Sequence, residues 1–331
     1  MERLLEVKNL MTSFFTPNGE VKAVNDVSYF VNKGEVVAIV GESGCGKSVT
    51  QMSVMRLVQT PPGRITNGEV LFNGIDLLKL DAKEMRKIRG SEIAMVFQEP
   101  MTSLNPVFTV GTQISEVIRT HAKCSKSEAW KIGVQALAEV GIPAPESRML
   151  SYPFEMSGGM RQRVMIAIAV ACRSKLIIAD EPTTALDVTT QAQVMELLLS
   201  LVKRNHTSLV VVTHNLGLVT RYADRIYVMY AGRIVEAGTT EELMMRPKHP
   251  YTIGLLNSVP KLDGNKEEAL VPIHGAPPNL AKLNSNCAFM PRCPYAKQGL
   301  CDKENAPTLR LVGDHEHYSA CHIDVEGLKH E

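Results

Sequence analysis

The sequence lacks an apolar run long enough to cross a bilayer, and it lacks an excess of charge of either sign. No stretch approaches the roughly 18 consecutive apolar residues of a transmembrane helix, so we expect the chain to cross no membrane. Its 36 basic and 35 acidic side chains leave a net charge of +1. Because the net charge is close to zero, the electrostatic field of the protein would not attract nucleic acid or an anionic membrane. We therefore predict no nucleic-acid partner.

Further absences narrow the class of protein. Charges interrupt the first residues, MERLLEVKNL, so these lack the apolar core of a secretory signal, and we expect a cytoplasmic protein. Internal repeats and low-complexity tracts are also missing. Seven cysteines in a long chain of this kind indicate free thiols or metal ligands rather than a disulfide framework.

The apolar runs that are present, VVAIV, KLIIAD and SLVVVT, are short and rich in β-branched residues, which is typical of buried parallel strands. They alternate with helical patterns such as QAQVMELLLSLVKR, so we predict an α/β fold with a parallel sheet. Residues 4–31 contain alternating apolar stretches and the turn sequences TPNGE and VNKGE. These predict a small antiparallel β subdomain beside the parallel core.

Two segments depart from this alternation. Residues 106–173 are mostly helical in pattern and indicate a helical insertion into the core. Beyond about residue 240 the chain becomes richer in proline and poorer in apolar runs, so we expect an extension with little regular structure. The predicted division is a nucleotide-binding domain over 1–240 and a small cysteine-rich C-terminal extension over 241–331.

The octapeptide GESGCGKS, residues 41–48, follows one predicted strand and opens a helix expected over 47–58. In this context the pattern G-x-x-x-x-G-K-S predicts a phosphate-binding loop of a P-loop NTPase. Small residues let successive backbone N–H groups surround a phosphate, and the helix N-terminus adds partial positive charge. Lys47 would reach the outer phosphates, and the Ser48 hydroxyl would hold Mg²⁺.

Two acids follow the buried strand in KLIIADEP. Mg²⁺ prefers oxygen ligands, and hydrolysis of a phosphoanhydride needs a group that polarises water. We therefore expect Asp180 to organise the metal ion and Glu181 to act on the attacking water.

Later motifs carry a family resemblance. The segment MSGGMRQRVMIAIAVAC, which begins at Met156, resembles the signature motif and helix of ATP-binding cassette ATPases. Met156 replaces the usual leucine, and Met160 replaces a common glutamine in the manner of the peptide-importer branch. Gln98, Asp187 and His214 match the family's Q-loop, D-loop and switch histidine in the same order. The segments FQEPMTSLNP and HPYTIGLL are similar to those of oligopeptide, dipeptide and nickel importer subunits, and closest to the dipeptide type.

The resemblance implies the functional residues. Glu181, His214 and Gln98 would be catalytic, and Ser48, Gln98 and Asp180 would hold Mg²⁺. Phe14 would stack on adenine, although its neighbour Phe15 or simple core packing are alternatives. The implied nucleotide-binding set is Phe14, Gly41, Ser43, Gly44, Cys45, Gly46, Lys47, Ser48, Val49, Gln98, Asp180, Ser157, Gly158, Gly159 and Asp187.

The resemblance also implies partners. Two cassettes would pack head to tail, so that ATP on Lys47 of one is completed by residues 157–159 of the other. Residues 157–159 form a second group of small residues at a helix start, which one phosphate in the same chain cannot easily use as well. The partner would be a second copy of this chain or, as the resemblance more often implies, a similar but non-identical cassette. Two permease subunits and an extracytoplasmic solute-binding protein would complete a peptide or nickel-chelate importer at the cytoplasmic face of the membrane.

A cysteine cluster occupies the predicted extension, with the spacing C-x5-C-x7-C-x19-C. Four thiolates suit zinc or an iron–sulfur cluster, and this spacing matches the usual run of neither. Resemblance to dipeptide-type subunits favours a [4Fe-4S] cluster, while zinc, disulfides and unliganded thiols stay open, as does His322 as a substitute ligand. The expected ligands are Cys287, Cys293, Cys301 and Cys321.

Two other functions share the cassette motifs. A DNA-repair or chromosome clamp would need long coiled-coil or zinc-bearing insertions between the phosphate loop and the signature, and no heptads or basic tract occur there. A cassette for iron–sulfur assembly or another cytosolic task would not associate with a permease.

Overall fold

The structure is a computed structural model that describes residues 2–183, 187–258, 272–312 and 316–323. The described chain forms two compact units. The first comprises Glu2, residues 32–35 and the described residues of 79–212. The second comprises residues 3–31 and 36–78 and the described residues from 213 onward.

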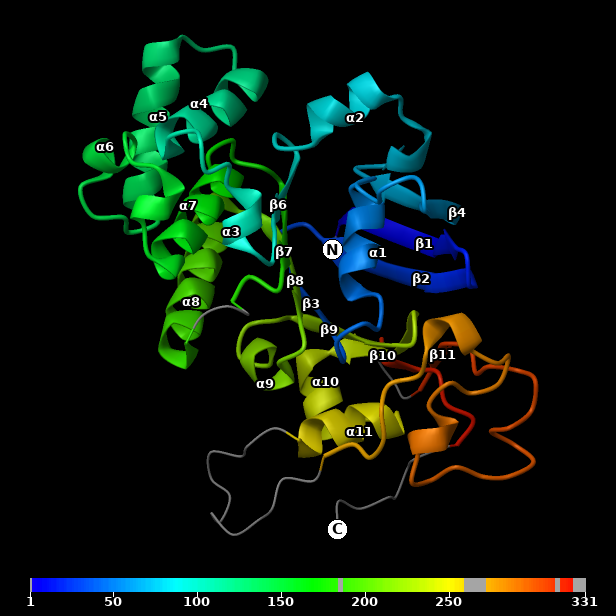
Figure 1. Ribbon diagram of the computed structural model, residues 1–331. Helices are drawn as coiled ribbons and strands as arrows, with labels where there is room; N and C mark the ends of the chain where they lie inside the picture. The colour runs from blue at the N-terminus through cyan, green and yellow to red at the C-terminus, as the bar shows by residue number, and fades with distance from the viewer. Residues whose placement is uncertain (1, 184–186, 259–271, 313–315, 324–331) are drawn as a thin grey trace. The chain divides into compact units, whose positions relative to one another are not determined.

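The second unit contains the predicted antiparallel sheet, drawn in blue in Figure 1. Its strand order is β2-β1-β4-β5, and β1 pairs antiparallel with β4. Most apolar side chains of both long strands are buried, and most of the more exposed positions are polar, as expected for a sheet covered on one side. The strands are β1 (Arg3–Thr16), β2 (Gly19–Asn32), β4 (Gly63–Phe72) and β5 (Ile75–Asp76).

The same unit contains the strand that leads into the phosphate loop. All five residues of β3 are buried, and β3 pairs in parallel with β9, which pairs antiparallel with β10. The order continues through β12 to β11 at the edge. These elements are β3 (Val36–Val40), β9 (Arg225–Tyr230), β10 (Arg233–Thr239), β11 (Arg310–Leu311) and β12 (Tyr318–Ser319). The unit's helices are α1 (Lys47–Val54), η1 (Leu77–Lys79), α9 (Leu216–Val219), α10 (Thr240–Met245), α11 (Pro250–Asn257), η3 (Leu280–Lys282) and η4 (Met290–Arg292).

The first unit combines a parallel sheet with the helical insertion. Its strands β6 (Ile93–Val96), β7 (Leu176–Asp180) and β8 (Ser208–Thr213) pair in parallel in that order. The helical stretch predicted over 106–173 is confirmed by α4, α5, α6 and α7, coloured green in Figure 1. The helices are α2 (Ala82–Ile88), α3 (Pro100–Ser103), α4 (Val110–His121), α5 (Lys126–Glu139), α6 (Pro145–Arg148), η2 (Pro153–Glu155), α7 (Gly158–Val170) and α8 (Val188–Asn205).

The structure corrects two expectations. The helix expected over 47–58 ends at Val54, and Arg56 has a φ of 51°, a left-handed conformation that stops a helix. The expectation of little regular structure beyond residue 240 is wrong for its first part. Thr239 and Glu242 form a capping box that starts α10, and His249 caps α11. The predicted division at residue 240 stays a prediction, and 259–271 and 324–331 lie outside the described residues.

No helix among the described residues combines the length and the apolar character that spanning a bilayer requires.

Candidate functional site

The phosphate loop joins β3 to α1 in the second unit. Its glycines are required by close backbone contacts. A Cβ atom at Gly41 would lie 2.1 Å from the carbonyl oxygen of Met229, and one at Gly46 would lie 2.2 Å from that of Ala23. Gly46 also has a φ of +106°, which side chains rarely adopt. The sequence therefore folds here into the tight loop at a helix N-terminus that binds phosphate.

Lys47 is buried within this loop. Its Nζ donates hydrogen bonds to the carbonyl oxygens of Gly41 (2.8 Å) and Glu42 (2.9 Å). The Sγ atom of Cys45 lies 4.0 Å from the same Nζ, and burial raises the pKa of the Cys45 thiol. Cys45 is thus a protonated, buried packing residue at neutral pH, and the ammonium of Lys47 is fixed at the loop that the sequence assigns to phosphate.

The C-terminal helix α11 contacts this loop directly. The Tyr251 hydroxyl accepts a 2.8 Å hydrogen bond from the backbone N–H of Glu42. Nδ1 of His249 accepts a 3.0 Å hydrogen bond from the N–H of Tyr251, and burial lowers the pKa of His249 to about 4, which keeps this nitrogen an acceptor. The buried Glu236 carboxylate accepts from the N–H of His249 (2.9 Å) and pairs with His317 (2.7 Å). The HPY sequence of α11 is therefore a support for the phosphate loop.

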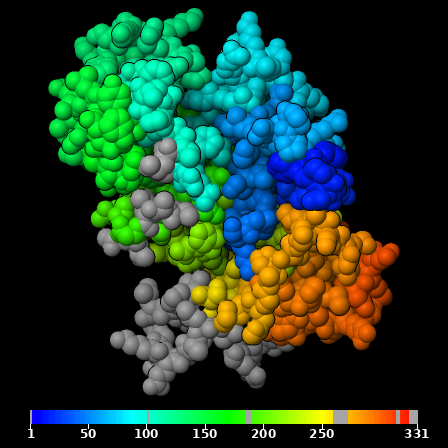
Figure 2. All heavy atoms as spheres, viewed as in Figure 1, coloured from blue at the N-terminus to red at the C-terminus, as the bar shows by residue number. Residues whose placement is uncertain are grey.

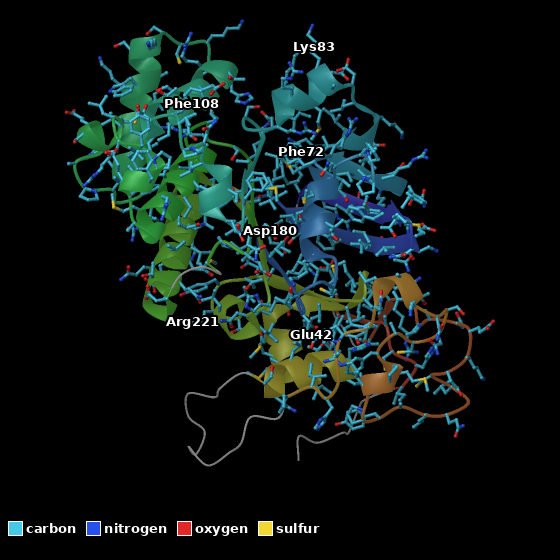
Figure 3. All side chains as sticks on the ribbon, viewed as in Figure 1. Glu42, Phe72, Lys83, Phe108, Asp180 and Arg221 are labelled. Atoms are coloured by element: carbon cyan, nitrogen blue, oxygen red, sulfur yellow. The ribbon has the colours of Figure 1, made fainter. Side chains whose placement is uncertain are left out.

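The two acids predicted to act on metal and water end β7 in the first unit. Asp180 and Glu181 are both buried, and Figure 3 labels Asp180. Glu181 adopts a φ of +44°, and its backbone N–H donates to the Val212 carbonyl (2.9 Å). Nε2 of Gln98 donates a 3.0 Å hydrogen bond to Oε2 of Glu181. The structure thus brings Gln98 and Glu181 together, 83 positions apart in the chain.

The signature motif forms the start of α7, also in the first unit. Ser157 is the N-cap, and its hydroxyl accepts from the N–H of Met160 at 3.3 Å. Ser157 and Gly158 are exposed, and a Cβ at Gly158 would meet nothing within 4 Å. Asp187 is the N-cap of α8, where its carboxylate accepts from the N–H and the hydroxyl of Thr190. The helices α7 and α8 therefore both begin at residues for which the sequence predicts a role in ATP binding.

His214 follows β8 directly and is exposed. Its neighbour Asn215, where the family usually has aspartate, donates its N–H to the Thr213 hydroxyl (3.0 Å). The Asn215 side chain accepts from the N–H of Leu218 (3.1 Å) and caps α9. Asparagine and aspartate cap helices about equally well, so this departure does not disturb the local fold.

The aromatic pair expected near adenine lies at the end of β1. Phe14 is half-buried and lies opposite Gly63 of β4. A Cβ atom added at Gly63 would lie 2.9 Å from the Phe14 ring, so the glycine leaves room for this ring. Phe15 is 51% exposed, so it presents the larger free ring face. The choice of Phe14 over Phe15 stays a prediction.

The four clustered cysteines are free thiols of the second unit, Cys287, Cys293, Cys301 and Cys321. Burial, and then the neighbouring thiols, raise the pKa of Cys293 to about 11. The thiols are thus within electrostatic range of one another. Among the described residues, however, no three Cys, His, Asp or Glu side chains are placed to hold a metal ion. This geometry does not support the iron–sulfur cluster or its zinc alternative.

His322 is the substitute ligand that the sequence leaves open beside the cysteines. Its Nε2 instead forms a 3.0 Å hydrogen bond with the carbonyl oxygen of Asn305.

Sequence reasoning missed two residues that contact the phosphate loop. Tyr251 lies within HPYTIGLL, which carries a family resemblance and no predicted role, and Arg292 lies between Cys287 and Cys293. Arg292 lies 250 positions from its partner Glu42, and no local pattern encodes a pairing at that separation. The available signal was a single charged residue between cysteines in the otherwise apolar stretch CAFMPRC.

Comparison with known proteins agrees with this geometry. The family model described as ABC transporter matches residues 24–184, and that described as the oligopeptide/dipeptide transporter C-terminal region matches residues 235–301. The oligopeptide transport ATP-binding protein of Bacillus subtilis is 53% identical over 316 residues, covering 96% of this chain and 87% of that protein. The dipeptide transport ATP-binding protein of the same organism is 50% identical over 303 residues, covering 92% and 90%.

Solved structures give the same result for the fold. A dimeric ATP-binding cassette in a post-hydrolysis state bound to ADP and Pi is 29% identical, with a TM-score of 0.64. The similarity covers 71% of this chain and 98% of that one, which confirms the predicted cassette fold. Relatives about half identical over nearly the whole length therefore establish that the chain belongs to the ATP-binding cassette transporter ATPases, in the branch of oligopeptide and dipeptide transport ATP-binding proteins.

Proposed function

We propose that this ABC ATPase powers the import of di- and oligopeptides, with related small solutes such as nickel chelates as the alternative cargo. The observation that carries the proposal is the match of residues 235–301 to the oligopeptide/dipeptide transporter C-terminal region. That region includes Tyr251 and Arg292, which contact the phosphate loop. The clamp and cytosolic-cassette alternatives lack support of this kind.

Each site residue is proposed to act through the geometry around it. Lys47 and the loop amides would bind the outer phosphates of ATP. Asp180, Ser48 and Gln98 would hold Mg²⁺, which supplies charge neutralisation at those phosphates when bound. Glu181, kept in place by Gln98, would polarise the attacking water.

The remaining nucleotide contacts are proposed for the adenine and for the cassette interface. His214 would contact the terminal phosphate, and Phe14 would stack on adenine. Ser157 and Asp187 would serve the nucleotide of a second cassette. Support comes from the exposed N-terminus of α7, whose amides and partial positive charge are available to a phosphate from outside the chain.

The partner set is proposed on the same basis. A second, non-identical cassette and two permease subunits would place the chain at the cytoplasmic face of the membrane, with a solute-binding protein on the opposite side. Val107 and Phe108, before α4, are 71% and 49% exposed. Apolar side chains on such a segment suit contact with a permease helix.

A further proposal concerns the cysteines of the C-terminal segment, by which we mean the described residues 272–312 and 316–323. This segment would bind a metal centre through thiolates, and a [4Fe-4S] cluster is preferred to zinc. Its support is the presence of four free cysteines in one segment of the second unit and two backbone hydrogen bonds to sulfur, although the described side chains as placed do not form a metal site. Lys297 donates to Cys301 (3.5 Å), and Ile323 donates to Cys321 (3.4 Å). Anaerobic purification with absorption spectroscopy and metal analysis tests it. A colourless protein with stoichiometric zinc, or without metal, would end the iron–sulfur proposal.

Uptake assays test the cargo. Cells that carry the wild-type chain or its Glu181→Gln variant are compared for uptake of a labelled dipeptide, a labelled pentapeptide and a nickel–histidine chelate, with Glu196→Gln as the matched surface control. We expect peptide uptake to require Glu181. If cells with Glu181→Gln lose uptake of the nickel chelate and keep uptake of both peptides, the cargo is the nickel chelate and not a peptide.

A further inference from the structure

The phosphate loop carries a carboxylate that the C-terminal segment neutralises. Arg292, in η4, forms a two-pronged ion pair with Glu42, the second residue of the loop. Nη1 lies 2.6 Å from Oε2, and Nη2 lies 2.8 Å from Oε1. The Arg292 side chain is 5% exposed and that of Glu42 is 25% exposed, so water screens this pair little.

The guanidinium is held by more than Glu42. Its Nε donates a 3.0 Å hydrogen bond to the carbonyl oxygen of His274, and Nη1 donates to the Tyr230 hydroxyl at 3.4 Å. The Tyr230 ring packs against Tyr251 and Phe289, with centroid distances of 4.6 and 5.2 Å. In Figure 2 the orange C-terminal segment lies next to the blue part of the same unit.

The opposite side of Glu42 is fixed as well, because its backbone N–H donates to Tyr251. Main chain and side chain of one loop residue, labelled in Figure 3, are thus both held by residues of the C-terminal region.

The chemistry of the pair follows from the charge of the ligand. ATP brings three to four negative charges to the loop, and an unpaired carboxylate one residue from Gly41 would oppose them through a poorly screened medium. A bidentate arginine cancels that charge and directs the carboxylate away from the loop amides.

We propose that Arg292 is a positioning residue of the ATP site, which neutralises Glu42 and so allows the phosphate loop to bind a nucleoside triphosphate tightly. The guanidinium of Arg292 thus gives the C-terminal segment an electrostatic effect on nucleotide affinity, in addition to the support of the loop main chain by Tyr251. The competing explanation is that the pair only fastens the C-terminal segment to the rest of the unit.

Suppression separates the two explanations. In the full-length protein, Arg292→Ala leaves Glu42 charged and unpaired, whereas the double variant Arg292→Ala with Glu42→Gln removes both charges. Binding of a fluorescent ATP analogue is measured without Mg²⁺ at low and high salt, with thermal midpoints recorded for each variant. Lys303→Ala, an exposed position in the same segment, is the control.

We expect Arg292→Ala to raise the dissociation constant about tenfold at low salt and less at high salt, because salt screens the exposed carboxylate. Glu42→Gln in that background should restore affinity to within about twofold, without restoring the thermal midpoint. Glu42→Gln alone should bind at least as tightly as wild type. If Arg292→Ala does not fold, a Glu42→Gln single variant that binds more weakly than wild type overturns the proposal, as does failure of the double variant to recover affinity.

Discussion

Nε2 of Gln98 donates a 3.0 Å hydrogen bond to Oε2 of Glu181, so the residue that precedes the helical insertion orients the carboxylate at the end of β7. A change at the helical insertion can therefore reach the proposed general base through a single side chain.

Replacing Gln98 by Ala should lower ATP turnover roughly tenfold to a hundredfold, because Glu181 loses the donor that fixes its orientation. Steady-state phosphate release measures the effect. Gln135→Ala is the matched control, since Nε2 of Gln135 donates to Glu139 at 3.1 Å on an exposed face of α5. Equal turnover in the two variants would remove Gln98 from this role.

The Glu181→Gln variant should lose at least about 100-fold in turnover, since an amide cannot accept the proton of the attacking water. ATP binding should persist, and cassette dimers should accumulate in MgATP on size-exclusion chromatography. Glu196→Gln on α8 serves as the control. Ordinary hydrolysis by Glu181→Gln would exclude this carboxylate as the base.

Gly46→Ala should abolish ATP binding, because the added Cβ would lie 2.2 Å from the carbonyl oxygen of Ala23 and the loop would have to move. Gly19→Ala is the matched control: its φ of +114° is similar, and nothing lies within 4 Å of its added Cβ. The control should cost about 1 kcal/mol of stability and leave nucleotide binding intact. Calorimetric titration with ATP distinguishes the two variants.

Unfolding should become easier as pH falls from about 6.5 toward 4. Burial lowers the pKa of His249 to about 4 in the folded chain, so the unfolded chain binds the extra proton first and gains stability relative to the fold. Glu236 opposes the shift, and His317 pairs with the same carboxylate. The loss from His249 alone is at most about 3 kcal/mol at the lower end of this window.

Urea unfolding at a series of pH values measures that loss. The variant His249→Asn retains a side chain able to cap α11 and cannot titrate, so its stability should depend less steeply on pH between 6.5 and 4. Parallel curves for wild type and variant would show that another group is responsible.

Much of the fold could be predicted because its strands, loop and helices depend on residues that are close together in the sequence. The strand before Gly41, the loop that follows it and the helical insertion were all predicted from periodicity, glycine spacing and apolar runs. The order of the motifs along the chain also predicts that Gln98, Glu181 and Ser157 serve one reaction.

Contacts between distant segments could not be predicted in this way. The buried Glu236 accepts hydrogen bonds from three different residues, and its own surroundings in the sequence, RIVEAGT, suggest only a strand. The helix α11 follows a composition shift that favoured irregular structure, and its stability comes from capping by His249 and from burial of Tyr251.

The hydrogen bond from Glu42 to Tyr251 has a consequence for how such cassettes can be shortened. A chain cut after Thr239 would keep every motif that defines the family, yet its nucleotide loop would lose the phenol that secures its main chain. Minimal cassettes borrowed from this branch should therefore include α11, and hybrids that exchange C-terminal regions should be expected to alter the affinity for ATP as well as whatever the exchanged region binds.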